Sequence, residues 1–182
     1  MKSKENSWVK NLLGWGQRRQ STTAETLYAA TVEVARDPAL FTSYGVNDDV
    51  DGRFDALALA VALVMRRLKD CGDEGKELSQ QLFDSMFADM DLSLREMGAG
   101  DLGVAKRVRV MAEGFMGRLD AYAAALDADD DAALASALTR NLLRGDDKID
   151  PAGNGLVGHV KSLATRFEAV PETELLAGKL GN

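Results

Sequence analysis

The sequence predicts an all-α protein, with one bundle of about six helices (residues 22–182) after a flexible basic tail (residues 1–21). Apolar residues recur at steps of three and four over long stretches, and no strand-like alternation persists outside them. Only 3 of the 182 residues are proline, which suits helices better than a strand-and-turn fold. With 46% apolar and 6% aromatic residues, the core of such a domain would consist mainly of Ala, Leu, Val and Met.

The first two helices are predicted from their capping signals. Thr22-Thr23-Ala24-Glu25 has the spacing of a capping box, so a helix should run from about residue 24 to residue 36 and end before Pro38. Asp51 follows a polar loop and is expected to cap a second helix over about residues 52–69. That helix is apolar on more than one side, which indicates central burial or a side that faces a partner.

The third and fourth helices are the longest and most regular. The third, over about residues 74–97, carries an apolar stripe that Phe83 and Phe87 widen, with Leu78, Leu82, Met86, Met90, Leu94 and Met97 as its other members. Its methionines indicate core packing or an adaptable apolar surface. Glycines end this helix, and Asp101 is expected to cap the fourth, which reaches about residue 126. The stripe of the fourth helix comprises Val104, Val108, Met111, Phe115, Leu119, Tyr122 and Leu126.

Shorter helical segments complete the chain. After the acidic run 127–131, a helix should carry Leu134, Leu138 and Leu142. Asp150-Pro151 is either a boundary or the start of a helix with proline at its first position. The stripe that follows it contains Leu156, Val160, Leu163 and Phe167, and Pro171 should open a short terminal piece.

Chemistry that needs a metal or a cofactor finds no support in the sequence. The single cysteine, Cys71, has no partner for a disulfide, and the single histidine, His159, has no companion at metal-ligand spacing. The spacing Gly98-x-Gly100-x-x-Gly103 matches a dinucleotide fingerprint, but a helix precedes it where a strand is needed. The run 47–52 resembles the start of a calcium loop whose closing position is Ala58. No cofactor and no metal site are expected.

The composition also bears on location. The longest apolar run, residues 56–65, is too short to cross a bilayer, and no secretory signal is recognisable. The expected location is cytoplasmic, with peripheral contact at the inner face of a membrane as a further option. Net charge is −7, which divides into +4 for residues 1–20 and −11 for the rest.

The tail combines aromatic, apolar and basic residues. Its candidate contact residues are Trp8, Lys10, Leu12, Leu13, Trp15, Arg18 and Arg19. This composition fits a weak interfacial helix on anionic lipid, an arm that touches ribosomal RNA, or a disordered leader.

A seam of small residues runs along the fourth helix at Gly103, Gly114, Gly117 and Ala121, beside Arg107 and Arg118. Each glycine inside a helix costs about 1 kcal/mol relative to alanine, so several on one side require a reason. Close approach of another backbone is such a reason, and the other backbone is either a neighbouring helix of this chain or a helix of a bound protein.

The third helix offers one further candidate surface. Asp84, Asp91 and Arg95 fall on one stripe, which is either a solvated ion-paired face or a binding face. Acid–base catalysis between Asp84 and Asp91 lacks a basic or nucleophilic partner at a set spacing, so no enzyme is expected.

The chain resembles the ubiquinol–cytochrome c chaperone family from about residue 27 to residue 141. The resemblance rests on Leu82-Phe83-Asp84, on residues 86–91, on residues 94–98, on Gly100-Asp101-Leu102, on Lys106-Arg107-Val108 and on Met111-Ala112. Phe115-x-Gly117-Arg118, Ala121-Tyr122, Tyr44-Gly45-Val46 and residues 51–55 extend it. Met116, where an aromatic is expected, and Asn47-Asp48, in place of a proline turn, depart from the pattern.

This resemblance implies a helical chaperone that binds newly made cytochrome b and supports its assembly into the bc1 complex. It implies no catalytic residues and no DNA binding, and the ribosome and an accessory assembly factor are possible partners. A helical domain that binds lipid or a small molecule without catalysis is the alternative. The candidate client-binding residues are Tyr44, Arg53, Asp84, Phe87, Asp91, Arg95, Gly103, Lys106, Arg107, Gly114, Gly117 and Arg118.

Overall fold

The computed structural model describes residues 22–98 and 100–181, and within them it contains helices and no strands. The helices are α2 (Thr22–Ala35), α3 (Pro38–Thr42), α4 (Val50–Leu68), α5 (Gly72–Glu96), α6 (Asp101–Asp127), α7 (Asp131–Asn141), α8 (Leu156–Glu168) and α9 (Glu172–Leu175). Six of them are longer than ten residues and match the six predicted helices. The prediction of an all-α bundle is therefore confirmed.

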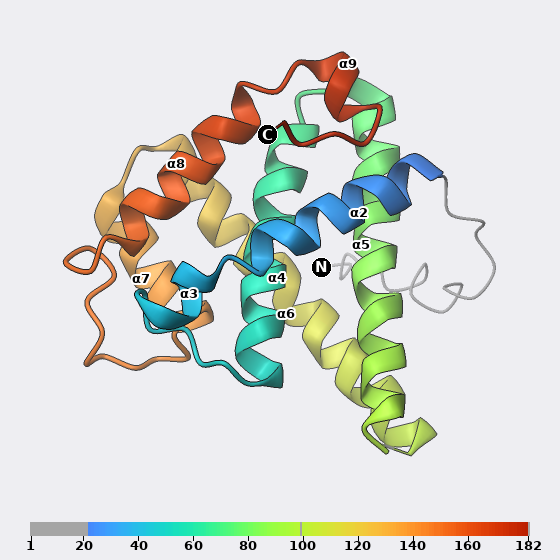
Figure 1. Ribbon diagram of the computed structural model, residues 1–182, viewed down its shortest axis with the longest axis horizontal. Helices are drawn as coiled ribbons and strands as arrows, with labels where there is room; N and C mark the ends of the chain where they lie inside the picture. The colour runs from blue at the N-terminus through green and yellow to red at the C-terminus, as the bar shows by residue number, and fades with distance from the viewer. Residues whose placement is uncertain (1–21, 99, 182) are drawn as a thin grey trace, which may run out of the picture.

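Helix α4 occupies the centre of the bundle. It contacts α2, α5, α6 and α8, while α7 covers α6 and α8 (Figure 1). Every residue from Phe54 to Val64 is buried, which explains why the apolar character of this helix is not confined to one side. The prediction of central burial is confirmed for α4.

Helices α5 and α6 form an antiparallel hairpin around an aromatic cluster. The ring centroid of Phe83 lies 4.7 Å from that of Phe87 and 5.6 Å from that of Phe115, and Phe54 of α4 joins at 6.4 Å from Phe87. Such tilted and edge-on pairs stabilise a core beyond their area burial. The connected ends of α5 and α6 extend past the other helices (Figure 1).

Several predicted helix starts are wrong by a few residues. Asp49, not Asp51, caps α4, because its Oδ1 accepts a hydrogen bond from the backbone N–H of Gly52 at 2.7 Å. Asp51 thus lies in the first turn, where its carboxylate is available to side chains. In α6, Gly100 is the N-cap and Asp101 is the first helical residue. For α4, two nearby aspartates compete for the cap, and Asp51 instead pairs with Arg107 and Arg144 of other segments.

Two proline predictions have different outcomes. Pro171 caps the short helix α9, as expected. Pro151 lies in a turn instead of opening a helix, and α8 begins only after Gly155, whose φ of 88° requires the left-handed conformation that glycine adopts without strain. The short helix α3 was not predicted, although Pro38 stands at its first turn, where proline is well tolerated.

Candidate functional site

A network of carboxylates and guanidinium groups joins α4 to α6 and to the segment after α7. Asp55 of α4 has a fully buried carboxylate, which accepts from Arg118 of α6 at 2.5 Å and from Arg144 at 2.6 Å. One turn earlier, Asp51 pairs with Arg107 of α6 at 3.0 Å and with Arg144 at 3.4 Å. These four pairs fix α6 and the segment after α7 to the start of α4.

The electrostatics of this network follow from burial. Desolvation raises the pKa of the Asp55 carboxyl, and the hydrogen bonds and charges of Arg118 and Arg144 act in the opposite direction. The guanidinium carbon of Arg118 also lies 5.6 Å from the centre of the Phe54 ring, a cation–π distance. Arg118 is therefore held by a carboxylate and an aromatic ring of the same helix.

Arg107 and Arg118 were predicted to contact a client directly. The structure places both in ion pairs within the protein, so their first role is to hold α6 against α4. Arg107 remains half-exposed, whereas the Arg118 side chain is only 22% exposed. Replacing both by Glu would disrupt the fold and could not test client binding alone.

The three glycines of the small-residue seam of α6 face outward, whereas Ala121 is half-buried and packs against the core. A Cβ atom added at Gly103, Gly114 or Gly117 would meet no atom of the described residues within 4 Å. The hypothesis that a neighbouring helix of this chain packs on these glycines is therefore wrong for the part that the structure describes. Because steps of seven, four and three separate them, Gly103, Val110, Gly114 and Gly117 lie along one side of α6, and we call these four residues the glycine face.

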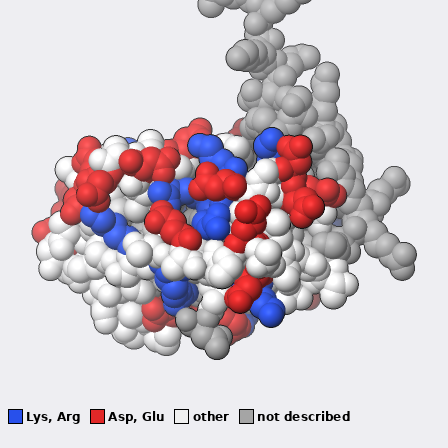
Figure 2. All heavy atoms as spheres, turned by 90° about the horizontal axis from the view of Figure 1, so that it is seen from above, with Lys and Arg blue, Asp and Glu red and all other residues white. Residues whose placement is uncertain are grey.

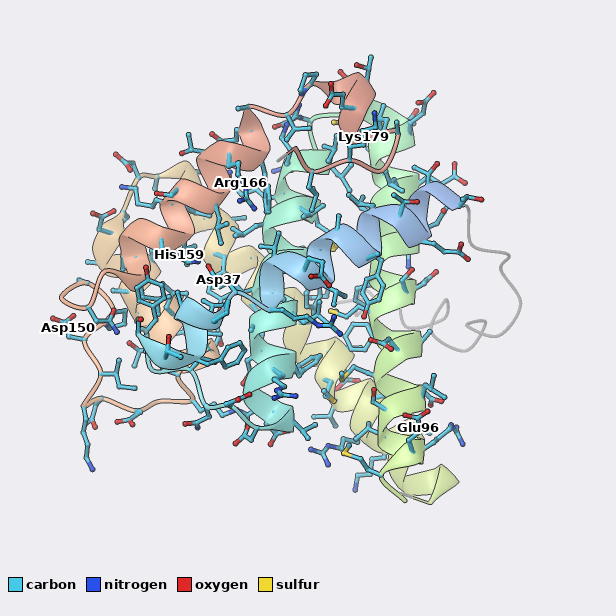
Figure 3. The ribbon with its side chains drawn as sticks, in the orientation of Figure 1. Asp37, Glu96, Asp150, His159, Arg166 and Lys179 are labelled. Atoms are coloured by element: carbon cyan, nitrogen blue, oxygen red, sulfur yellow. The ribbon has the colours of Figure 1, made fainter. Side chains whose placement is uncertain are left out.

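Val110, in the middle of the glycine face, is 59% exposed. It was missing from the predicted site residues, although the exposed large apolar side chains of the described residues are few: Val50, Leu92, Met97 and Val110. Its position seven residues after Gly103 and four before Gly114 is the sequence signal that could have placed it on the same side of α6 as the glycines. Leu92 and Met97 lie near the connected ends of α5 and α6, close in sequence to Glu96, which marks the lower end of α5 in Figure 3.

Of the predicted residues of α5, Phe87 is buried, Asp84 and Asp91 are half-buried, and Arg95 is exposed. Phe87 is fully buried in the aromatic cluster, so it cannot form a surface contact in this conformation. Asp91 forms an i,i+4 ion pair with Arg95, as its spacing indicated. Asp84 accepts a hydrogen bond from Gln80 at 2.9 Å. These contacts form a polar, ion-paired surface on α5.

The remaining predicted residues are scattered. Tyr44 is half-buried, with its ring centroid 4.9 Å from that of His159. Arg53 is exposed and pairs with Asp48. Lys106 is exposed one turn before Val110. The structure therefore brings Lys106 and Arg107 to the glycine face but leaves Tyr44 in another part of the fold.

Three charged residues of the network were not predicted as site residues: Asp51, Asp55 and Arg144. Asp55 stands at the start of a long apolar run, which is the signal that could have identified a buried carboxylate. Arg144 adopts a φ of 54°, unusual for a residue with a side chain, and the backbone there directs its guanidinium to both aspartates. No local pattern in the sequence predicts that geometry.

A groove of about 710 Å³ lies between α2, α8 and the C-terminal segment. Its apolar lining includes Ala30, Val34, Leu163 and Leu180, and its charged lining includes Glu33 and Arg166. Arg166 is labelled in Figure 3, and Figure 2 shows acidic and basic side chains interspersed on the face seen from above. None of the glycine-face residues lines this groove.

The described residues offer neither a cluster for a metal ion nor a helix that could span a membrane. Residues 22–98 and 100–181 contain no group of three or more His, Cys, Asp and Glu side chains arranged for a metal ion. None of the helices described is long and apolar enough to cross a bilayer. The predicted contact residues of the tail, from Trp8 to Arg19, lie outside the described residues.

Comparison with known proteins identifies the family. The sequence profile of the ubiquinol-cytochrome C chaperone family matches residues 42–181. Among solved structures, the chain is similar to the Cbp3 homolog from Brucella abortus, with 34% sequence identity, a TM-score of 0.78, and coverage of 95% of this chain and 93% of that chain. A search of curated proteins gives no match. The resemblance inferred from the sequence motifs is thus confirmed, and the chain belongs to the ubiquinol-cytochrome C chaperone family.

Proposed function

We propose that this protein is an assembly chaperone that binds newly made cytochrome b and supports its maturation into the bc1 complex. The observation that carries the proposal is the glycine face, an exposed stripe of small and apolar residues on a long helix of a chaperone-family protein. Similarity to the Cbp3 homolog from Brucella abortus supports the same role. The proposed role requires no catalysis.

The glycine face suits an apolar helix of a client. Without Cβ atoms at Gly114 and Gly117, a second helix backbone can approach closely, as in the small-residue contacts of membrane helices. Val110 supplies an exposed apolar side chain at the centre of the contact. Lys106 and Arg107 at its edge could meet the carbonyl or carboxylate groups at the end of a client helix.

Transient binding fits the small size of this surface. Cytochrome b segments that leave the ribosome expose apolar surface, which is an aggregation hazard until the segments are inserted or paired. A stripe centred on one valine covers such surface without the extensive burial that would slow release. Release would then require no nucleotide, and the purified protein should not hydrolyse ATP.

Other contacts belong to the same proposal. The exposed ion pair Asp91–Arg95 on α5 is a second candidate client contact. The basic, Trp-containing tail would hold the body near the ribosome or the inner face of the membrane, and an accessory assembly factor could bind a further surface.

The proposal is tested in cells that carry or lack this chain. We expect deletion to lower both the b-type haem spectrum and the amount of assembled bc1 complex. Val110→Glu should cause the same loss, because a carboxylate at the centre of the glycine face cannot be desolvated against an apolar helix. Ala105→Glu is the matched control, since Ala105 is exposed on α6 but lies off the glycine face.

The possible results test the chaperone role and the glycine face separately. Normal bc1 assembly in the deletion strain would contradict the chaperone role. Loss in the deletion strain together with normal assembly in Val110→Glu would retain the role and exclude the glycine face. Equal loss in Val110→Glu and Ala105→Glu would point to a general defect of α6, which a thermal unfolding experiment on the purified variants would reveal.

A helical domain that binds lipid or a small molecule remains the alternative function. The groove between α2 and α8 favours it, because its volume and its apolar lining could hold an acyl chain. Native mass spectrometry of the purified protein would show one bound lipid per chain if this alternative is correct. A ligand-free mass together with normal bc1 assembly in Val34→Arg would exclude it.

A further inference from the structure

We propose that the N-terminal tail, residues 1–21, docks on the outward side of α5 in the same molecule. Helix α5 contains seven acidic and two basic side chains, a net charge of −5. Within residues 1–20 there are five basic side chains and one acidic side chain, a net charge of +4. The tail thus has opposite charge to the helix beside which it enters the fold.

The place where the tail joins the body supports this pairing. The described chain begins at Thr22, and Thr23 lines a crevice of about 180 Å³ together with Glu74, Glu77, Leu78, Gln81 and Leu176. Arg18 and Arg19 precede Thr22 by only four and three residues. Their guanidinium groups can therefore reach the carboxylates of Glu74 and Glu77 at the rim of the crevice, where charge-assisted hydrogen bonds would form.

The apolar part of the tail has a matching surface farther along α5. Ala88 is exposed and Leu92 is 55% exposed, one turn apart on the same side of α5 as Glu74 and Glu77. Leu92 follows Glu77 by 15 helical residues, about 22 Å, and the six residues from Arg18 back to Leu12 reach about 20 Å when extended, so with the length of the side chains the tail spans this distance. Leu12, Leu13 and Trp15 would cover Leu92 once Arg18 and Arg19 are anchored.

Attachment to the body favours this contact over contact with another molecule. A segment tethered by a few residues has an effective concentration of the order of millimolar at its own α5, well above typical protein concentrations in a cell. The residues that would dock are also those suited to anionic lipid, so docking and lipid contact exclude each other, and the membrane contact named under the proposed function requires release of the tail from α5. This inference does not depend on the identity of the client.

Tryptophan fluorescence tests the proposal directly, because Trp8 and Trp15 are the only two tryptophans of the chain. We expect the emission of the full-length protein, without lipid, to be blue-shifted and less quenched by acrylamide than that of a peptide of residues 1–21. Raising the salt concentration to 1 M shortens the screening length from about 10 Å at 0.1 M to about 3 Å and should reduce the difference.

Two variants locate the contact. Glu74→Lys/Glu77→Lys should shift the emission towards that of the free peptide, and Leu92→Asn should do the same without a change of charge. Asp146→Lys/Asp147→Lys, an exposed pair after α7, makes the same change in net charge and should leave the emission unchanged. Thermal unfolding verifies that each variant is folded.

Several results would overturn the proposal. Emission of the full-length protein equal to that of the peptide would show that the tail does not dock. A blue shift that persists in both α5 variants would place the tail on another surface. A shift that disappears on dilution would mean that it binds a second copy of the chain. Blue-shifted emission that appears only with anionic vesicles would favour a membrane contact.

Discussion

Asp55 is a charged residue within the buried part of the central helix, and its two arginine partners explain how it is tolerated. Its side chain is fully buried, while those of Arg118 and Arg144 are 22% and 42% exposed. Removing one member of a buried pair leaves the other charges without compensation, which typically costs 3–5 kcal/mol. Because the arginines can partly turn to water, we expect Asp55→Asn to lower the free energy of unfolding by about 3 kcal/mol.

Chemical denaturation of the purified protein checks this expectation. Asp48→Asn is the control, since Asp48 also pairs with an arginine, Arg53, but both side chains are largely exposed. Its denaturation midpoint should equal that of the wild-type protein, because exposed pairs contribute little. If the two substitutions lowered the free energy of unfolding equally, burial of Asp55 would not determine how much its ion pairs contribute to stability.

His159 makes stability depend on pH. Burial lowers the pKa of its imidazole below the ordinary value of 6.5; Asp37 raises it less, and Arg166 adds to the lowering. The Asp37 carboxylate lies 3.7 Å from Nε2 (Figure 3). The unfolded chain binds the proton of His159 more tightly than the folded protein does. The contribution of neutral His159 to the free energy of unfolding is therefore complete above about pH 6.5 and is lost as the pH falls through the lower pKa of the folded protein.

We expect the free energy of unfolding to be smaller at about pH 5.5 than at about pH 7.5, with a smaller difference in His159→Phe. Phenylalanine retains a ring against Tyr44 but cannot be protonated. Denaturation curves of both proteins at the two pH values provide the measurement. An unchanged pH dependence in the variant would assign it to other groups.

At the scale of helices, glycines in α5 and α6 have opposite roles. A Cβ atom at Gly114 would meet no described atom within 4 Å, so Gly114→Ala should stabilise the protein by about 1 kcal/mol through helix propensity. A Cβ atom at Gly75 would lie 2.2 Å from the backbone oxygen of Leu68, so Gly75→Ala should destabilise it by about 2 kcal/mol. Thermal or urea denaturation of the two variants measures the sign of each change in stability.

The sign of the stability change in Gly114→Ala also bears on function. If Gly114→Ala lowers stability, another segment or a second molecule covers the glycine face in solution. If it raises stability but impairs bc1 assembly, the glycine serves a contact outside the body of the chain. Such an exchange of stability for activity is common at binding surfaces.

Helix positions and the buried stripes could be predicted from the sequence, because steps of three and four are a local property of the chain. Val104, Val108, Phe115 and Tyr122 of α6 are all buried, as their spacing indicated. The environment of the seam on the same helix was not predictable, since glycine spacing is the same whether a neighbour is present or absent. Choosing between Asp49 and Asp51 as the cap of α4 likewise required the arginines of distant segments.

At the scale of the whole molecule, the parts of the candidate site near the central helix α4 are held more firmly than the parts far from it. The network of Asp51 and Asp55 fixes the side of α6 beside the glycine face to the central helix. At the other end of α4, Arg66 pairs with Asp127 at 2.8 Å and with Glu168 at 2.5 Å, which joins the end of α6 to α8. The resulting body is held on several sides, and the connected ends of α5 and α6 are its least enclosed part.

Hydrogen exchange should reveal this gradient of stability. The amides of Phe54–Val64 in α4 lie in a completely buried segment and are expected to exchange only through global unfolding. The amides near the joined ends of α5 and α6 should exchange through local opening, because Met97 is 52% exposed and Gly98 has a φ of 84° in the turn. Asp55→Asn should therefore accelerate exchange in α4 and leave the exchange of this turn nearly unchanged. Equal acceleration in both segments would show that the hairpin end unfolds only together with the core, and a client would then meet a rigid surface along the whole of α6.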